Sequence, residues 1–125
     1  MKKSILYLLL IVFSFILNSP AIAGESKCKT AIDSVTFSKY TKEVDAHDFD
    51  DAKIKSIQLQ LASKCFSSAQ VKTLLQLLSF EEDKLSVAKT AFPKVVDPAS
   101  FTVILDIFEF DSSKKEVKDF IAASK

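Results

Sequence analysis

The sequence predicts a small all-α domain of about six helices, arranged as three stacked helical hairpins of about 30 residues each. The only glycine of the sequence is Gly24, so residues 25–125 contain none. Two-residue β-hairpin turns and phosphate-binding loops therefore lack the residue on which they depend. Apolar residues recur at i, i+3, i+4 and i+7, the spacing of one helix face. A motif of phenylalanine, acid, two variable residues and lysine occurs three times, 31 and 30 residues apart, which is typical of a helical repeat.

Residues 1–23 are expected to be a signal peptide that is cleaved after Ala23. Two lysines follow the first residue, residues 5–17 form a nearly unbroken apolar run, and small residues precede the cleavage point. These are the three parts of a secretory signal, and the run is shorter than the roughly 20 residues of a membrane span. We therefore expect a periplasmic or secreted protein with no membrane span after cleavage. Residues 24–125 would form a single α-helical domain.

The two cysteines, Cys28 and Cys65, both lie in the part of the chain that is expected to be exported. In an oxidising compartment, a pair of cysteines most simply forms a structural disulfide. A redox-active pair would usually have C-x-x-C spacing, which is not the spacing here. In the loop-closure model, a bond across this separation stabilises a domain by roughly 4 kcal/mol. We predict a Cys28–Cys65 disulfide that ties the N-terminal segment to the end of the first hairpin.

Six apolar stripes predict the helices in chain order. Four further apolar residues, Leu59, Leu77, Val87 and Ile107, lie off these stripes and are expected to be buried where middle helices pack on two sides. The stripes are Phe37, Tyr40 and Val44; Ile54, Ile57 and Leu61; Val71, Leu74, Leu75 and Leu78; Leu85, Ala88 and Phe92; Phe101, Ile104, Leu105 and Phe108; and Val117, Phe120 and Ile121.

Polar residues and prolines predict where the helices begin and end. The segments 67–70 and 113–116 each read as a capping box, with serine first and glutamine or glutamate three residues later. Asp97 precedes Pro98, which combines an N-cap acid with proline at the first helical position. Pro93 should end or bend the fourth helix near Phe92, because proline is costly inside a helix.

The repeated motif reads FDDAK at residues 49–53, FEEDK at 80–84 and FDSSK at 110–114. We expect its acids to be helix-start charges, which are stabilised by the positive end of the helix dipole. Successive acids point about 100° apart on a helix, so they do not converge on one ligand. We expect the motif lysines Lys53, Lys84 and Lys114 to pair with these acids at the surface. Phe80 is expected to plug the space between helices, because phenylalanines are core residues by default.

Catalytic and metal-binding groups are sparse. The densest candidate is DAHDFDD at residues 45–51, which contains the single histidine, His47. It lacks the spacing and the central glycine of an EF-hand loop and has no apolar pocket in which a catalytic histidine would act. A solvated turn is therefore the preferred interpretation. We predict no catalytic residue, no metal site and no cofactor, and hence a protein that is not an enzyme.

The charge of the chain also argues against nucleic acid as a partner. The expected mature chain has nearly balanced charge and contains no arginine. It therefore has neither the basic footprint nor the bidentate side chains that bind phosphate strongly.

Two long stretches, CFSSAQVKTLLQLLSFEEDKLSVAKTAF and VVDPASFTVILDIFEFDSSKKEVKDFI, resemble the domain-of-unknown-function family 4476, which is found in exported proteins of Gram-negative bacteria. The resemblance covers roughly residues 30–123. It implies an α-helical exported domain and brings no activity, ligand or catalytic residue with it.

The preferred hypothesis is an exported, non-catalytic helical interaction module. It would bind a protein or peptide through one face of the hairpin stack, as helical arrays do, in the cell envelope or outside the cell. The alternative is a carrier of a small apolar ligand such as a lipid, suggested by the eleven phenylalanines of the chain. No residue pattern assigns the partner, the binding residues or the oligomeric state.

Overall fold

The computed structural model describes residues 28–124, which form five α-helices and two 3-10 helices without a strand. The predicted all-α fold is therefore confirmed, whereas the predicted signal peptide lies outside the described residues. Within the described part, no helix combines the length and the apolar character that crossing a membrane requires. In chain order the helices are α2 (Ser34–Asp45), α3 (Asp50–Leu61), α4 (Ser68–Gln76), α5 (Glu81–Ala91), η1 (Phe92–Lys94), η2 (Pro98–Ile107) and α6 (Asp111–Ala123).

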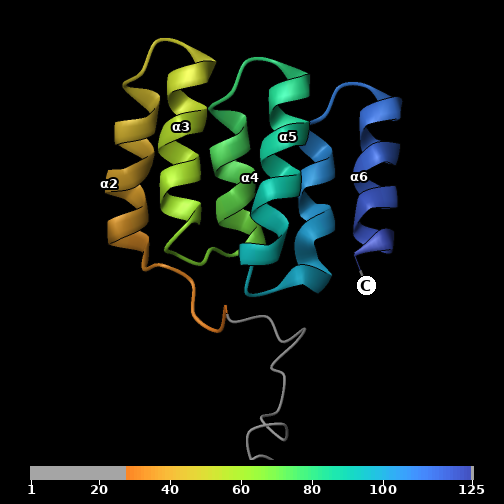
Figure 1. The fold of residues 1–125 in the computed structure, drawn as a ribbon, viewed down its shortest axis with the longest axis horizontal. Coiled ribbons are helices and arrows are strands. Elements are labelled where there is room, and N and C mark those ends of the chain that lie inside the picture. Colours follow the sequence, from red (N-terminus) through yellow and green to blue (C-terminus); the bar gives the residue numbers. More distant parts are fainter. Residues whose placement is uncertain (1–27, 125) are drawn as a thin grey trace, which may run out of the picture.

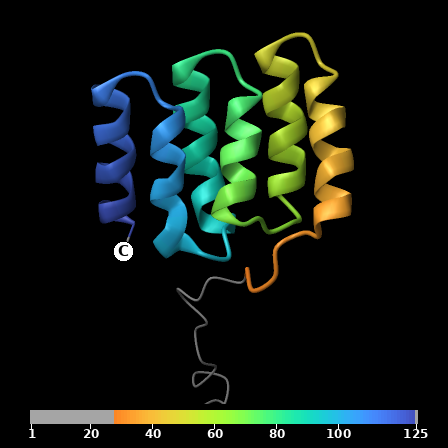
Figure 2. The same ribbon diagram turned by 180° about the vertical axis from the view of Figure 1, so that it is seen from behind.

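The helices form three antiparallel hairpins, α2–α3, α4–α5 and η2–α6, which stand side by side (Figure 1). The second helices α3, α5 and α6 lie in one layer, with α5 packed against both of the others. The first helices α2, α4 and η2 lie in the other layer, as the view from behind shows, and α4 packs closely against η2 (Figure 2). All three hairpin turns lie at one edge of the stack, and the connections between hairpins lie at the opposite edge (Figure 1).

The core lies between the two layers and consists of the predicted stripes. Its largest members, Phe66 and Phe101, are fully buried. Phe66 lies beside Phe37 and Tyr40, with ring centroids 6.3 and 6.1 Å away. Of the residues off the stripes, Val87 is buried and Leu77 and Ile107 are half-buried. The burial predicted for Leu59 is wrong, because this residue of α3 is 72% exposed.

Three predictions about helix ends have mixed outcomes. The capping box at residues 67–70 is present, with hydrogen bonds in both directions between Ser67 and Gln70. α5 ends at Ala91, directly before the Phe92–Lys94 turn that contains Pro93, as predicted. The prediction of a capping box at residues 113–116 is wrong. α6 already begins at Asp111, and Ser113 lies buried in its first turn.

The sequence predicts an α-helix as the fifth helix. The structure instead has η2, which is a 3-10 helix throughout its ten residues. A 3-10 helix has three residues per turn, so Phe101, Ile104 and Ile107 share a face. The i, i+3 steps of the apolar pattern fit both helix types and do not distinguish them. The β-branched residues of this segment lower its preference for the α-helix.

The edge that holds the connections between hairpins is cross-linked, and we call it the disulfide edge (residues 28–33, 62–67 and 92–97). The predicted Cys28–Cys65 disulfide is present there, with the two Cα atoms 5.4 Å apart. Backbone bonds continue along the edge, from the Ile32 N–H to the Cys65 carbonyl at 3.0 Å and from the Val96 N–H to the Phe66 carbonyl at 2.9 Å. Asp97 is the N-cap residue of η2 and Pro98 begins the helix, as predicted, but the Asp97 carboxylate makes no cap bond and instead accepts the Ser68 N–H from the second hairpin at 2.7 Å.

Candidate functional site

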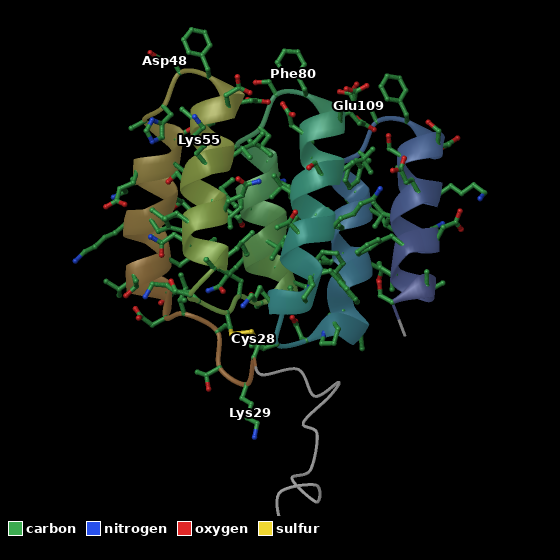
Figure 3. The ribbon with its side chains drawn as sticks, in the orientation of Figure 1. Cys28, Lys29, Asp48, Lys55, Phe80 and Glu109 are labelled. Carbon is green, nitrogen blue, oxygen red and sulfur yellow. A yellow bond between two sulfur atoms is a disulfide. The ribbon has the colours of Figure 1, made fainter. Side chains whose placement is uncertain are left out.

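The edge that holds the three hairpin turns carries the most unusual surface feature of the molecule. Phe49, Phe80 and Phe110 occupy the same position in the three motifs, and these residues are 77%, 66% and 60% exposed. Figure 3 shows the ring of Phe80 projecting above its loop, with Asp48 and Glu109 on the neighbouring loops of the same edge. The expectation that Phe80 plugs the space between helices is wrong. We call this surface the phenylalanine edge (Phe49, Phe80 and Phe110).

These exposed rings occupy positions where they do not cap the helices that follow. Phe49, Phe80 and Phe110 are the N-cap residues of α3, α5 and α6, and none makes a side-chain cap bond. Ser, Thr, Asp and Asn are favoured at the N-cap because their oxygens accept helical N–H groups, whereas large apolar residues are disfavoured. The same chain caps α2 with Asp33 and α4 with Ser67 through such bonds. An apolar residue before an acid at a helix start was the signal in the sequence that could have identified this edge.

The first acid of the first motif, Asp50, and the first acid of the second motif, Glu81, each hydrogen-bond the turn of the next hairpin. We call this contact a clasp. The Asp50 carboxylate accepts the Ser79 N–H at 2.9 Å and the Phe80 N–H at 3.1 Å. The Glu81 carboxylate accepts the Glu109 N–H at 3.1 Å and the Phe110 N–H at 3.0 Å. The backbone of two of the three exposed phenylalanines is therefore fixed by the preceding hairpin.

The clasps also shift the acidity of the carboxyl groups that form them. Desolvation acts to raise the pKa of Glu81, but the N–H groups of Phe110 and Glu109 outweigh it and lower this pKa. Desolvation likewise opposes the N–H groups of Phe80 and Ser79 at Asp50, whose pKa is also lowered. Hydrogen bonds to the charged form of a carboxylate favour ionisation. The predicted role of these acids as helix-start charges is confirmed by their place in the first turns of α3 and α5, and the clasps add a second role that was not predicted.

Asp83 shows how much negative charge gathers at this edge. Desolvation, a hydrogen bond to Asp50 and repulsion from Asp50, Asp51 and Glu82 all raise the pKa of Asp83. The residue in the same position of the third motif is Ser113, whose hydroxyl hydrogen-bonds Glu81 and helps to lower its pKa. The fourth motif position therefore supports the clasp acid of the preceding hairpin.

Lys53 does not form the simple surface pair that the sequence suggested, whereas the charge of Lys84 acts on the motif acid Glu81 and helps to lower its pKa. The Lys53 ammonium donates to the Leu77 carbonyl at the C-terminal end of α4, at 2.9 Å, and lies 3.8 Å from Asp45. Its side chain is only 13% exposed. A cation at the end of a helix stabilises the unpaired carbonyls there. Lys53 therefore joins the first hairpin to the second and faces the body of the molecule.

The segment at residues 45–51 is the remaining candidate from the sequence. His47 lies exposed in the turn between α2 and α3. Across residues 28–124 there is no group of three or more His, Cys, Asp or Glu side chains arranged to hold a metal ion. The feature that the structure brings together is instead a row of exposed aromatic rings with carboxylates beside them.

Substitution of Glu81 by glutamine tests the clasp. Glu81→Gln is expected to lower the melting temperature at neutral pH by about 3–6 °C, because the amide keeps one acceptor oxygen but loses the charge. The pKa of Glu81 is lowered on folding, so its contribution is present above the unfolded value of about 4.3 and is lost as the pH falls through the lower folded value. The wild-type chain and the variant should therefore converge in acid. Thermal unfolding followed by circular dichroism at pH 7 and at successively lower pH values, until the two chains have equal melting temperatures, measures this difference.

Glu82→Gln is the matched control for this experiment. Glu82 lies in the same turn, is exposed and makes no clasp bond, so this variant loses the same charge without losing a clasp. Equal losses of stability in the two variants would contradict the structural role of Glu81.

The chain belongs to the family described as Domain of unknown function (DUF4476), whose model matches residues 31–121. Searches of curated proteins and of solved structures both return no match to this chain.

Proposed function

We propose that this protein is an exported, non-catalytic interaction module that binds a protein or peptide at its phenylalanine edge, in the cell envelope or outside the cell. The observation that carries the proposal is the exposure of Phe49, Phe80 and Phe110 at three equivalent positions. Solvent-exposed aromatic side chains are enriched at protein interfaces because they bury much area with few rotatable bonds.

Two further observations support binding at this edge. Rings at N-cap positions do not serve helix stability, so their threefold repetition calls for another role. The clasps from Asp50 and Glu81 fix the loop backbone that bears Phe80 and Phe110, which reduces the entropy lost when a partner binds. The disulfide supports export, because such bonds persist in oxidising compartments.

The nine phenylalanines of the described residues favour edge binding over an apolar carrier. Three stand exposed at the phenylalanine edge, five belong to the core or pack against it, and the half-buried Phe120 lies beside Phe92. The phenylalanines that suggested a lipid carrier therefore lie either in the packed interior or at the phenylalanine edge.

Replacing an edge phenylalanine by serine separates function from stability. Phe80→Ser is expected to raise the free energy of unfolding by about 0.5–1 kcal/mol, because the serine hydroxyl can cap α5 and little apolar burial is lost. Urea denaturation of the wild-type chain and the variant measures the change. A loss of more than about 1 kcal/mol would assign the ring to the fold and remove the main support for a binding role.

The binding role is tested with the triple variant Phe49→Ser/Phe80→Ser/Phe110→Ser. The full mature chain, wild-type or variant, is cross-linked in cell-envelope extract, and the captured proteins are quantified by mass spectrometry. We expect at least one protein to be enriched by the wild-type chain and lost with the triple variant. Leu59→Gln is the matched control, because it removes a side chain that is 72% exposed from α3 but lies outside the edge. Capture that is equal for wild-type and triple variant, or absent with both, would refute the proposal.

A further inference from the structure

The phenylalanine edge concentrates most of the negative charge of the chain. The segments 45–53, 79–84 and 109–114 contain nine of the sixteen Asp and Glu residues but only three lysines. The remainder of the molecule is therefore net positive, and the edge is strongly negative. The charge is thus separated along the hairpins, from an acidic edge with aromatic rings to the disulfide edge.

The solvent-facing part of the edge is also acidic, because six of these nine acids are exposed and none of the three lysines is. Lys53 is turned toward the Leu77 carbonyl, and Lys84 and Lys114 are half-buried. Each ring has an exposed acid two residues or less beyond it in the chain. These acids are Asp51, Glu82 and Asp111.

The rings recur at the spacing of the hairpins. α3, α5 and α6 pack as successive neighbours, and packed helices lie roughly 8–10 Å apart. Three residues of a polyproline II segment span roughly 9 Å and complete one turn, so side chains three residues apart point to the same side. A segment that runs along the edge would therefore present every third side chain to a ring and its neighbouring acid.

From this arrangement we infer that the partner, on the premise of the proposed function, is a protein segment in the polyproline II conformation with Arg or Lys at every third residue. Each cationic side chain stacks on one phenylalanine ring and pairs with the adjacent carboxylate of Asp51, Glu82 or Asp111. Cations are attracted to the faces of aromatic rings, and oppositely charged surfaces steer the two partners together. Anionic lipid surfaces and nucleic acids are repelled by the same charge.

The inference is tested with synthetic peptides and the mature chain with its disulfide intact. One fluorescent peptide has arginine at every third position, and its isomer has the same composition with the arginines adjacent. We expect fluorescence anisotropy to show tighter binding of the spaced peptide, weakened by added salt. The triple phenylalanine variant should lose about tenfold to a hundredfold in affinity. The charge variant Asp51→Asn/Glu82→Gln/Asp111→Asn should also bind more weakly, and Leu59→Gln should bind like the wild-type chain.

The outcomes separate this inference from the proposed function. If neither peptide binds, or both bind equally, the inference fails, whereas a partner captured from extract in a phenylalanine-dependent manner would still support the proposed function. Vesicles of anionic phospholipid provide a further arm. Binding to these vesicles that depends on the three phenylalanines would overturn both, because the edge would then be a membrane contact.

Discussion

Replacing Cys28 and Cys65 by serine is expected to lower the free energy of unfolding by about 2–4 kcal/mol. The bond closes a loop across 37 residues of separation, so its loss enlarges the set of unfolded conformations. A domain of this size is stabilised by only about 5–15 kcal/mol in total. The disulfide therefore accounts for a large fraction of the stability of the fold.

Urea denaturation of the double variant Cys28→Ser/Cys65→Ser, beside the oxidised and the reduced wild-type chain, measures this effect. Reduced wild-type protein should resemble the double variant, because both lack the cross-link. An increase in the slope of unfolding free energy against urea would accompany the loss, since an unfolded chain without the cross-link exposes more surface. A double variant as stable as the oxidised chain would contradict the stabilising role of the bond.

Phe66→Ala is expected to cost about 3–5 kcal/mol, the largest effect of any single substitution considered for this chain. The Phe66 side chain is fully buried against Phe37 and Tyr40, and its removal leaves a cavity that the surrounding helices fill only in part. The backbone of Phe66 also joins the second and third hairpins through the Lys94 carbonyl and the Val96 N–H.

The chain contains its own matched control for this substitution. Phe49→Ala makes the same chemical change at a ring that is 77% exposed, and it should change the unfolding free energy by less than about 0.5 kcal/mol. Comparing the two variants by thermal and urea unfolding isolates the contribution of burial. Similar costs for both would contradict the division of the phenylalanines into core and edge.

The hairpins could be predicted from the sequence because their signals are local. Stripes such as that of Val71, Leu74, Leu75 and Leu78 repeat within two helical turns, and the capping box at Ser67 lies within four residues. The 3-10 form of η2 could not be predicted, since Phe101 and Ile104 are spaced correctly for both helix types.

The candidate site was harder to predict because it depends on distances between hairpins. Asp50 and Glu81 lie about thirty residues from the N–H groups that they accept, and only the stacking of hairpins brings these partners together. Hydrophobicity alone placed Phe80 in the core, whereas its N-cap position at the edge of the stack exposes it. An N-cap residue lies at the end of its helix, and the N-terminal ends of α3, α5 and α6 form the phenylalanine edge.

The two edges of the stack are held by bonds of different chemical sensitivity. At the phenylalanine edge, the Asp50 and Glu81 clasps depend on ionised carboxylates, so acid weakens them. At the disulfide edge, the Cys28–Cys65 bond responds to reductant and is indifferent to moderate acid. Proton concentration therefore acts on the clasps at the phenylalanine edge, whereas redox potential acts on the cross-link at the opposite end of the same helices.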